Sequence, residues 1–400
     1  MGSRLFKFYR EVSTPKCVHF FNLAIIIRFL TKTRIDMKLK DIVKLFEQFA
    51  PFALQEDYDN SGIQFGDPEA EVSKGLVCID ITEEILNEAI EKECDLIISH
   101  HPLIFRGLKK LTGSHYSERV LIEAIRNNIS IISVHTNLDS VSEGVNRKLA
   151  RKLGLLDNTI LMPKKGVLKK LVTFCPGDHA EKVRSAIFSA GAGHIGEYDC
   201  CSYNLEGTGS FRAGENADPF VGDKGQIHYE PELRIETILP AWLEKSVINS
   251  MISAHPYEEV AYDVYQLDNN YGKAGGGMIG YLDEPMAEIE FLNHVKEVLG
   301  VPFLRHSSFI NRKIKKVAIC GGSGSFLRDS AMSAGADAFV TADIKYHDFF
   351  DVNKKMLLID AGHYESEQFT KEILYEIVSK KITNFALLIS DQSSNPVRYF

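Results

Sequence analysis

Short apolar runs alternate with amphipathic segments along most of this chain. Apolar runs bounded by polar residues predict buried strands, whereas apolar positions three and four residues apart predict helices. Strands that alternate with helices indicate an α/β fold, in which helices cover a parallel sheet. The expected strands are residues 75–80, 96–98, 128–134, 316–320, 338–341 and 356–359, and the expected helices are residues 39–49, 82–93, 117–126, 143–153, 326–333 and 365–380.

The strand at residues 96–98 delivers two adjacent histidines, His100 and His101, to its C-terminal end. Open α/β sheets keep their functional sites at that end of the strands. Successive residues of a strand point to opposite faces, so this pair suits two different metal ions better than one ion. An isolated pair also fits a plainer interpretation, in which one ring caps the strand and the other is solvated.

Two further strands end in the same way. Residues 128–134 run into His135 and Asp139, and residues 356–359 run into His363 and Glu367. In a sheet whose C-terminal edges lie side by side, these groups would converge although they are far apart in sequence. If a helix has begun by His363, its side chain and that of Glu367 lie on one helix face, because they are four residues apart.

The candidate ligands offer imidazole nitrogen and carboxylate oxygen but no thiolate: His100, His101, Asp139, His363 and Glu367. Such a set suits two divalent ions (Zn, Mn, Fe or Co) at an open site better than a closed structural zinc. A carboxylate that bridges two ions roughly 3.5 to 4 Å apart completes a two-metal centre. Glu367 is the residue expected to form that bridge.

Five sequence blocks resemble the NGG-interacting-factor-like family, also labelled the GTP cyclohydrolase I type 2 homologues. The resemblance extends from Met37 to the C-terminus, and in the fourth block Ala342 stands where the family commonly has Gly. It implies a dinuclear metal site with the five ligands named above and a ring-like homohexamer. The blocks, in the family's order, are DYDNSGIQFG (57–66), SHHPLIF (99–105), HTNLD (135–139), TADIKYH (341–347) and AGHYESE (361–367).

A chain of 400 residues favours two or more domains. The predicted architecture is two α/β lobes, residues 37–165 and 271–400, around the dinuclear site. Between them, residues 166–270 carry a split βαβ outline with a long loop, which predicts an inserted ferredoxin-like domain. The segment HPYEEVAYDV (255–264) in this insert resembles the CutA- and PII-like group. His255, Glu258 and Glu259 suggest either a second metal site or a corner with solvated acids.

Composition narrows the possible partners and the compartment. The net charge of −8 argues against a surface that binds nucleic acid along the whole chain. The seven cysteines form no CxxC pair, which favours reduced thiols and a cytoplasmic address. Residues 1–36 contain an apolar run too short to span a bilayer. They are expected to be a poorly ordered extension upstream of Met37, with an export signal as the alternative.

The predicted function is metal-dependent hydrolysis. The resemblance suggests a nucleotide, such as GTP, or a related small molecule as the substrate, and a phosphoester or a cyclic amide fits the same groups equally well. His135 and His347 are the expected catalytic residues, because an imidazole moves protons at neutral pH. Asp343 and Lys345 are candidates for supporting groups. The glycine-rich residues 321–325 suggest either a phosphate-binding turn or tight packing. The alternative is a non-catalytic regulator or metal carrier, in which the insert senses a ligand or a partner.

Overall fold

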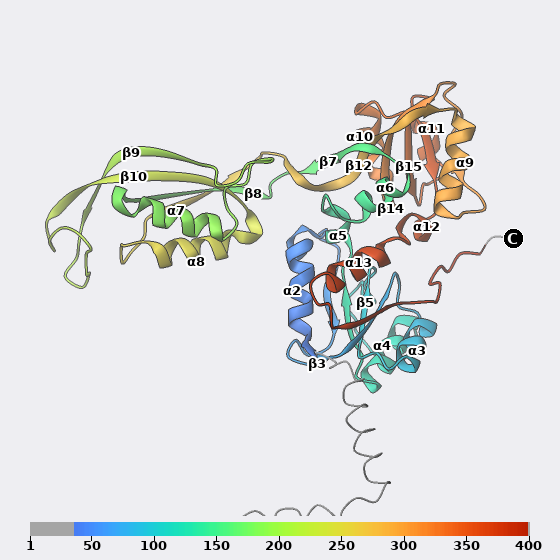
Figure 1. Cartoon of the computed structure of the whole chain (residues 1–400), viewed down its shortest axis with the longest axis horizontal. Helices are drawn as coiled ribbons and strands as arrows, with labels where there is room; N and C mark the ends of the chain where they lie inside the picture. Colours follow the sequence, from blue (N-terminus) through green and yellow to red (C-terminus); the bar gives the residue numbers. More distant parts are fainter. Residues whose placement is uncertain (1–35, 399–400) are drawn as a thin grey trace, which may run out of the picture. The chain divides into compact units, whose positions relative to one another are not determined.

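A computed structural model describes residues 36–398 of the chain (Figure 1). The predicted N-terminal extension, apart from Asp36, lies outside these residues. The chain divides into two compact units: residues 36–46, 62–133 and 374–394 form the first, and residues 47–61, 134–373 and 395–398 form the second. Within the described part of the chain, no helix combines the length and the apolar character needed to cross a membrane.

The first unit is built on a five-stranded sheet with the order β17-β4-β5-β6-β2. Its strands are parallel except β2, which runs antiparallel to β6. The strand bounds are β2 Gly62–Phe65, β4 Lys74–Cys78, β5 Leu96–Ser99, β6 Ser130–Ser133 and β17 Ala386–Ile389, with β1 Met37–Lys38 and β3 Glu71–Val72 as a separate pair. The helices are α2 Leu39–Phe49, α3 Glu83–Glu91 and α4 Tyr116–Arg126.

Every residue of β5 and β6 is buried, which explains why their sequences are short continuous apolar runs between polar ends. The helix α3 starts where its cap predicts. The Thr82 side chain accepts a hydrogen bond from the backbone N–H of Ile85 at 3.3 Å, so that α3 begins at Glu83.

The second unit contains a six-stranded sheet with the order β13-β16-β15-β14-β12-β7. Only β14, β15 and β16 are mutually parallel. The strands are β7 Leu156–Lys164, β12 Tyr271–Met286, β13 Arg305–His306, β14 Ile314–Ser323, β15 Ala338–Ala342 and β16 Leu357–Asp360. The helices are α5 Thr136–Ser140, α6 Val145–Lys152, α9 Glu288–Leu299, α10 Arg328–Ser333, α11 Asp348–Asp351, α12 His363–Glu367 and α13 Thr370–Ser379, with 3-10 turns η1 Phe52–Leu54 and η4 Ser325–Leu327.

Both faces of this sheet are buried. Along β14, Val317 and Ile319 belong to one hydrophobic cluster, whereas Ala318 and Cys320 belong to another. Because side chains alternate between the faces of a strand, the sheet has a core on each side. The mixed α/β fold predicted from the sequence is therefore confirmed.

The second unit also holds a four-stranded antiparallel sheet with the order β11-β8-β10-β9. Both α7 and α8 lie on the same side of it (Figure 1) and form a core with its inner face. The prediction of an uninterrupted long loop before β10 was wrong, because the strand β9 lies within that segment. The bounds are β8 Leu168–Pro176, α7 Ala180–Ser189, β9 Ser202–Arg212, β10 Ile227–Pro240, α8 Glu244–Ala254 and β11 Tyr262–Leu267, with 3-10 turns η2 Gly177–His179 and η3 Ala241–Leu243.

Two expectations about strand placement need correction. The strands β5 and β6 are parallel neighbours as expected, but β16 lies in a different sheet, so the three strand ends do not share one edge. The sheets also cross the predicted lobe limits of residues 37–165 and 271–400. The C-terminal β17 pairs with β4 in the first sheet, and β7 pairs with β12 in the six-stranded sheet.

Candidate metal centre

The two adjacent histidines follow β5 directly and are held by the neighbouring strand end. The backbone N–H groups of His100 and His101 donate to the carbonyls of Cys78 (3.2 Å) and Ile79 (2.9 Å). The His100 side chain is buried, and the two imidazole centroids lie 4.9 Å apart. The residues after β4 therefore fix the turn from which both rings project.

Asp80 orients one of these rings. Its Oδ1 lies 2.6 Å from His101 Nδ1, and its Oδ2 accepts a hydrogen bond from Ser394 Oγ at 2.7 Å. Burial alone would raise the pKa of the Asp80 carboxyl, but the hydrogen bond and charge of His101 outweigh burial and lower it. A carboxylate at Nδ1 is the usual support of a histidine that binds a metal through Nε2.

His135 has the same kind of support from Asp59. Asp59 Oδ1 lies 2.7 Å from His135 Nδ1, and its other oxygen accepts a hydrogen bond from the backbone N–H of Thr136 at 3.0 Å. Although burial favours the protonated form, hydrogen bonds from both residues hold the pKa of Asp59 well below its usual range. Asp59 thus fixes the start of α5, the helix that carries Asp139.

The helix α12 begins at His363, two residues before the predicted start at residue 365, so the His363 ring lies beside the Glu367 carboxylate one turn later. His363 Nε2 lies 3.1 Å from Glu367 Oε2, and Glu367 is buried. The Nδ1 atom of His363 faces Asp343 Oδ2 at 2.7 Å. Asp343 adopts a left-handed backbone conformation (φ +54°) immediately after β15. This third histidine–carboxylate pair follows the pattern of the other two.

The glycine-rich end of β14, which leads into the following loop, packs against the α12 carboxylate. A Cβ atom on Gly322 would come within 2.1 Å of Glu367 Oε1, and the residue has a φ of +59° that favours glycine. Its N–H donates to Ser366 Oγ, and the N–H of Gly321 donates to Asn146 Oδ1, each at 2.9 Å. Because side chains already accept these hydrogen bonds, the loop fits the packing interpretation better than the phosphate-binding one.

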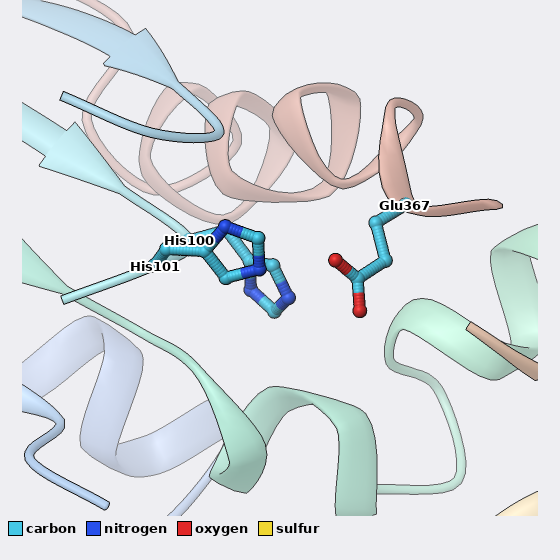
Figure 2. Close-up of side chains that lie close together, drawn as sticks. All are labelled: His100, His101 and Glu367. Atoms are coloured by element: carbon cyan, nitrogen blue, oxygen red, sulfur yellow. The ribbon is translucent and has the colours of Figure 1, made fainter. Parts of the chain in front are cut away.

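Three of the five predicted ligands form one close group. Ligand atoms of His100, His101 and Glu367 all lie within 4.8 Å of one another. Figure 2 shows the two imidazole rings side by side and the carboxylate facing them. Groups of histidine and carboxylate at this separation can hold a metal ion.

The other two predicted ligands belong to the second unit, as Glu367 does. His363 is in contact with it, as described above. Asp139 and Glu367 both act on the buried thiol of Cys320, since burial and then these two carboxylates raise the pKa of that thiol. Whether His363 and Asp139 bind a metal stays a prediction.

The two predicted catalytic histidines differ in their surroundings. His135 is fixed by Asp59 and only 15% exposed. His347 is exposed at the start of α11, where its ring centroid lies 5.2 Å from that of Tyr346 and 6.3 Å from that of Phe350. The roles of both residues in proton transfer stay predictions.

Sequence reasoning missed Asp80, although a signal was present. Asp80 ends the apolar run at residues 75–80, which is the strand that precedes the histidine-bearing one. A carboxylate at the C-terminal end of that neighbouring strand could have been added by the same rule that selected His100 and His101. Asp59 lies within the block DYDNSGIQFG (57–66) that carried the family resemblance, but spacing alone did not connect it with His135.

A family model described as Duf34/NIF3 (NGG1p interacting factor 3) matches residues 37–396. The chain belongs to this family. The resemblance drawn from the five motifs is therefore confirmed. Among its relatives, a Bacillus subtilis protein named GTP cyclohydrolase 1 type 2 homolog is 38% identical over 370 residues, which cover 90% of this chain and 98% of the relative.

Solved structures agree with this assignment. A Bacillus cereus protein described as related to NIF3 is 39% identical and superimposes with a TM-score of 0.80, covering 92% of this chain and 100% of its own. A Staphylococcus aureus protein is 31% identical with a TM-score of 0.72, covering 91% of this chain and 99% of its own. The fold is thus shared over nearly the whole length of each protein.

Proposed function

We propose that this Duf34/NIF3 protein is a metal-dependent hydrolase that uses two divalent ions (Zn, Mn, Fe or Co). The proposed ligands are His100, His101, Asp139, His363 and Glu367, with Glu367 as the bridge between the ions. The observation that carries the proposal is the close group formed by two histidines and a buried carboxylate. When bound, the ions would supply Lewis-acid activation of water and of a carbonyl or phosphoryl oxygen.

The surroundings of the ligands fit such ions. The donors are imidazole nitrogen and carboxylate oxygen, which suit Zn, Mn, Fe and Co at an open site. His101 and His363 each present Nδ1 to a carboxylate, at 2.6 Å and 2.7 Å. Carboxylates placed in this way orient the ring and increase its basicity, and they commonly accompany histidine ligands.

His135 is the residue we propose to move protons. The Asp59 carboxylate lies 2.7 Å from His135 Nδ1 and orients the ring, and an imidazole can accept and return a proton at neutral pH. The Asp59 carboxylate would stabilise the charged ring in between. His347 is retained as a second candidate, although its exposed ring is less restrained.

The proposed substrate is a nucleotide, such as GTP, or a related small molecule. This choice rests on the names of relatives such as the Bacillus subtilis GTP cyclohydrolase 1 type 2 homolog. The homohexamer implied by the family resemblance also remains a proposal.

A turnover assay tests this function. Protein loaded separately with each metal is offered a panel of nucleotides, phosphoesters and cyclic amides. His135→Ala should retain its metal and lose about 10²- to 10⁴-fold in rate, the usual contribution of a positioned general base. His194→Ala, at an exposed histidine of the same unit, is the matched control. Absence of turnover with every metal would favour the regulator or carrier function instead.

A further inference from the structure

The four-stranded sheet carries a large cavity, with a volume of about 770 Å³, on the face opposite α7 and α8. Its floor comes from directly paired residues, which share one face of an antiparallel sheet. Phe174 is paired with Arg234, and Glu232 is paired with Gly207. A volume of this size is typical of sites for small molecules.

Aromatic side chains form much of the wall. The Tyr257 ring centroid lies 6.5 Å from that of Phe211 and 6.1 Å from that of Phe220. Phe174 adds a fourth ring on the floor, with the Arg234 guanidinium 5.7 Å from its centroid. Such walls offer flat apolar surface to an aromatic ligand, and their negative ring faces attract cations.

The charge of the lining is negative. Four glutamates and two arginines line the cavity. One of the arginines, Arg234, already donates to Glu236 at 2.8 Å, which leaves less positive charge for a ligand. The cavity is therefore better suited to a cation than to a phosphate or a carboxylate.

Glu232 is the best-placed acid. Tyr257 donates its hydroxyl hydrogen to Glu232 Oε1 at 2.8 Å. Burial and then Glu232 raise the pKa of Tyr257, so the phenol remains a donor. The second oxygen lies over β9, where a Cβ atom on Gly209 would come within 2.2 Å of it. Glycine at that position therefore leaves room for the carboxylate.

We infer that this cavity binds a small aromatic cation, whose ring packs against the aromatic wall and whose amine or amidine group binds the Glu232 carboxylate. A planar amidine can donate two parallel hydrogen bonds to a carboxylate, and bonds between charged groups are the strong ones. The site is independent of the proposed hydrolase function, because none of its residues is a proposed metal ligand.

Benzamidine is the probe, and calorimetric titration of the full chain is the measurement. Benzamide, which has the same shape without the charge, should bind at least about tenfold more weakly. Glu232→Gln should weaken benzamidine binding by a similar factor. Glu230→Gln is the matched control, because Glu230 lies on the same strand but pairs with His228 at 2.7 Å outside the cavity lining.

Gly209→Ala gives a second test without removing charge, since the added methyl group displaces the Glu232 carboxylate. It should also weaken benzamidine binding while circular dichroism shows an intact fold. Equal affinity for benzamide and benzamidine, or unchanged binding in Glu232→Gln, would overturn the inference. So would the absence of binding at millimolar benzamidine. Binding should persist in Glu367→Gln, which separates this test from the metal proposal.

Discussion

Replacing Gly322 by alanine should displace the proposed bridging ligand, Glu367, without changing the Glu367 side chain itself. The new Cβ atom would lie 2.1 Å from Glu367 Oε1, far inside the 3.5 to 4.0 Å optimum for non-bonded atoms. The carboxylate is the flexible end of its side chain, so it should yield before the backbone does. It must retreat by about 1 Å or more.

That displacement is large on the scale of metal coordination, where ligand distances vary by only about ±0.2 Å. Loss of a residue that holds a metal ligand in place typically weakens metal binding about 10- to 100-fold. This corresponds to about 1.4 to 2.7 kcal/mol of binding free energy. Alanine in a left-handed conformation should also cost about 1 to 2 kcal/mol of folding stability, because φ is +59° at this position.

Gly335→Ala separates the two effects. Gly335 has a similar φ of +73°, and a Cβ atom there would have no neighbour within 4 Å. Both variants should lower the free energy of unfolding by a similar amount, measured by urea denaturation of the metal-free proteins. Only Gly322→Ala should weaken metal binding, measured by competition with a chromogenic chelator. Full metal affinity in Gly322→Ala would refute the proposed role of Glu367 as a ligand.

Three further predictions address the supporting residues, the core and the pH dependence. Asp80→Asn and Asp343→Asn should each weaken metal binding about 10- to 100-fold in the chelator assay, and unchanged affinities would argue against His101 and His363 as ligands. Phe339→Ala removes a fully buried ring and should cost about 3 to 5 kcal/mol of stability, whereas Phe350→Ala, at a 63% exposed ring, should cost less than about 0.5 kcal/mol. The Asp59 carboxyl has a lower pKa in the folded chain than its unfolded value of 3.8, so it stabilises the fold above that pH and loses this contribution as the pH falls below it. The difference in unfolding free energy between the parent protein and Asp59→Asn should therefore shrink below pH 3.8 in urea titrations. A constant difference would contradict the lowered pKa of Asp59 in the folded chain.

Local patterns predicted the elements whose signals lie within a few residues. The bounds of α2 match the prediction, because its apolar spacing is regular and Pro51 follows it. α12 begins at His363, the condition on which the pairing of that residue with Glu367 depended. The helical period was sufficient there, because both groups lie on one helix face.

Three strands at sheet edges were not predicted from the sequence: β2, β9 and β17. β9 has glycines at 207 and 209 and is exposed along most of its length, so it has neither an apolar run nor a clear alternation. β2 lies within a segment rich in turn-forming residues and was not among the expected strands. Pairing of β17 with β4, about 300 residues earlier in the chain, depends on non-local contacts that periodicity does not reveal.

The candidate ligands were predictable because each follows a strand or lies one helical turn from such a residue. The carboxylates that support them were harder to find, because each acts through a hydrogen bond between separate segments. Asp343 lies 20 residues before His363, and Asp80 lies 21 residues before His101. Sequence spacing alone gives no reason to join these residues, whereas the folded sheets bring each pair together.

The measurement that tests the central claim most directly is metal content per chain, by elemental analysis of protein purified without chelator. Glu367→Gln is compared with Glu365→Gln, which changes a buried glutamate of the same helix that binds Asn395 at 2.8 Å. The account predicts close to two ions in the parent and in Glu365→Gln, and a clear loss in Glu367→Gln. One ion or none in the parent, or a content unchanged in Glu367→Gln, would contradict the two-metal centre.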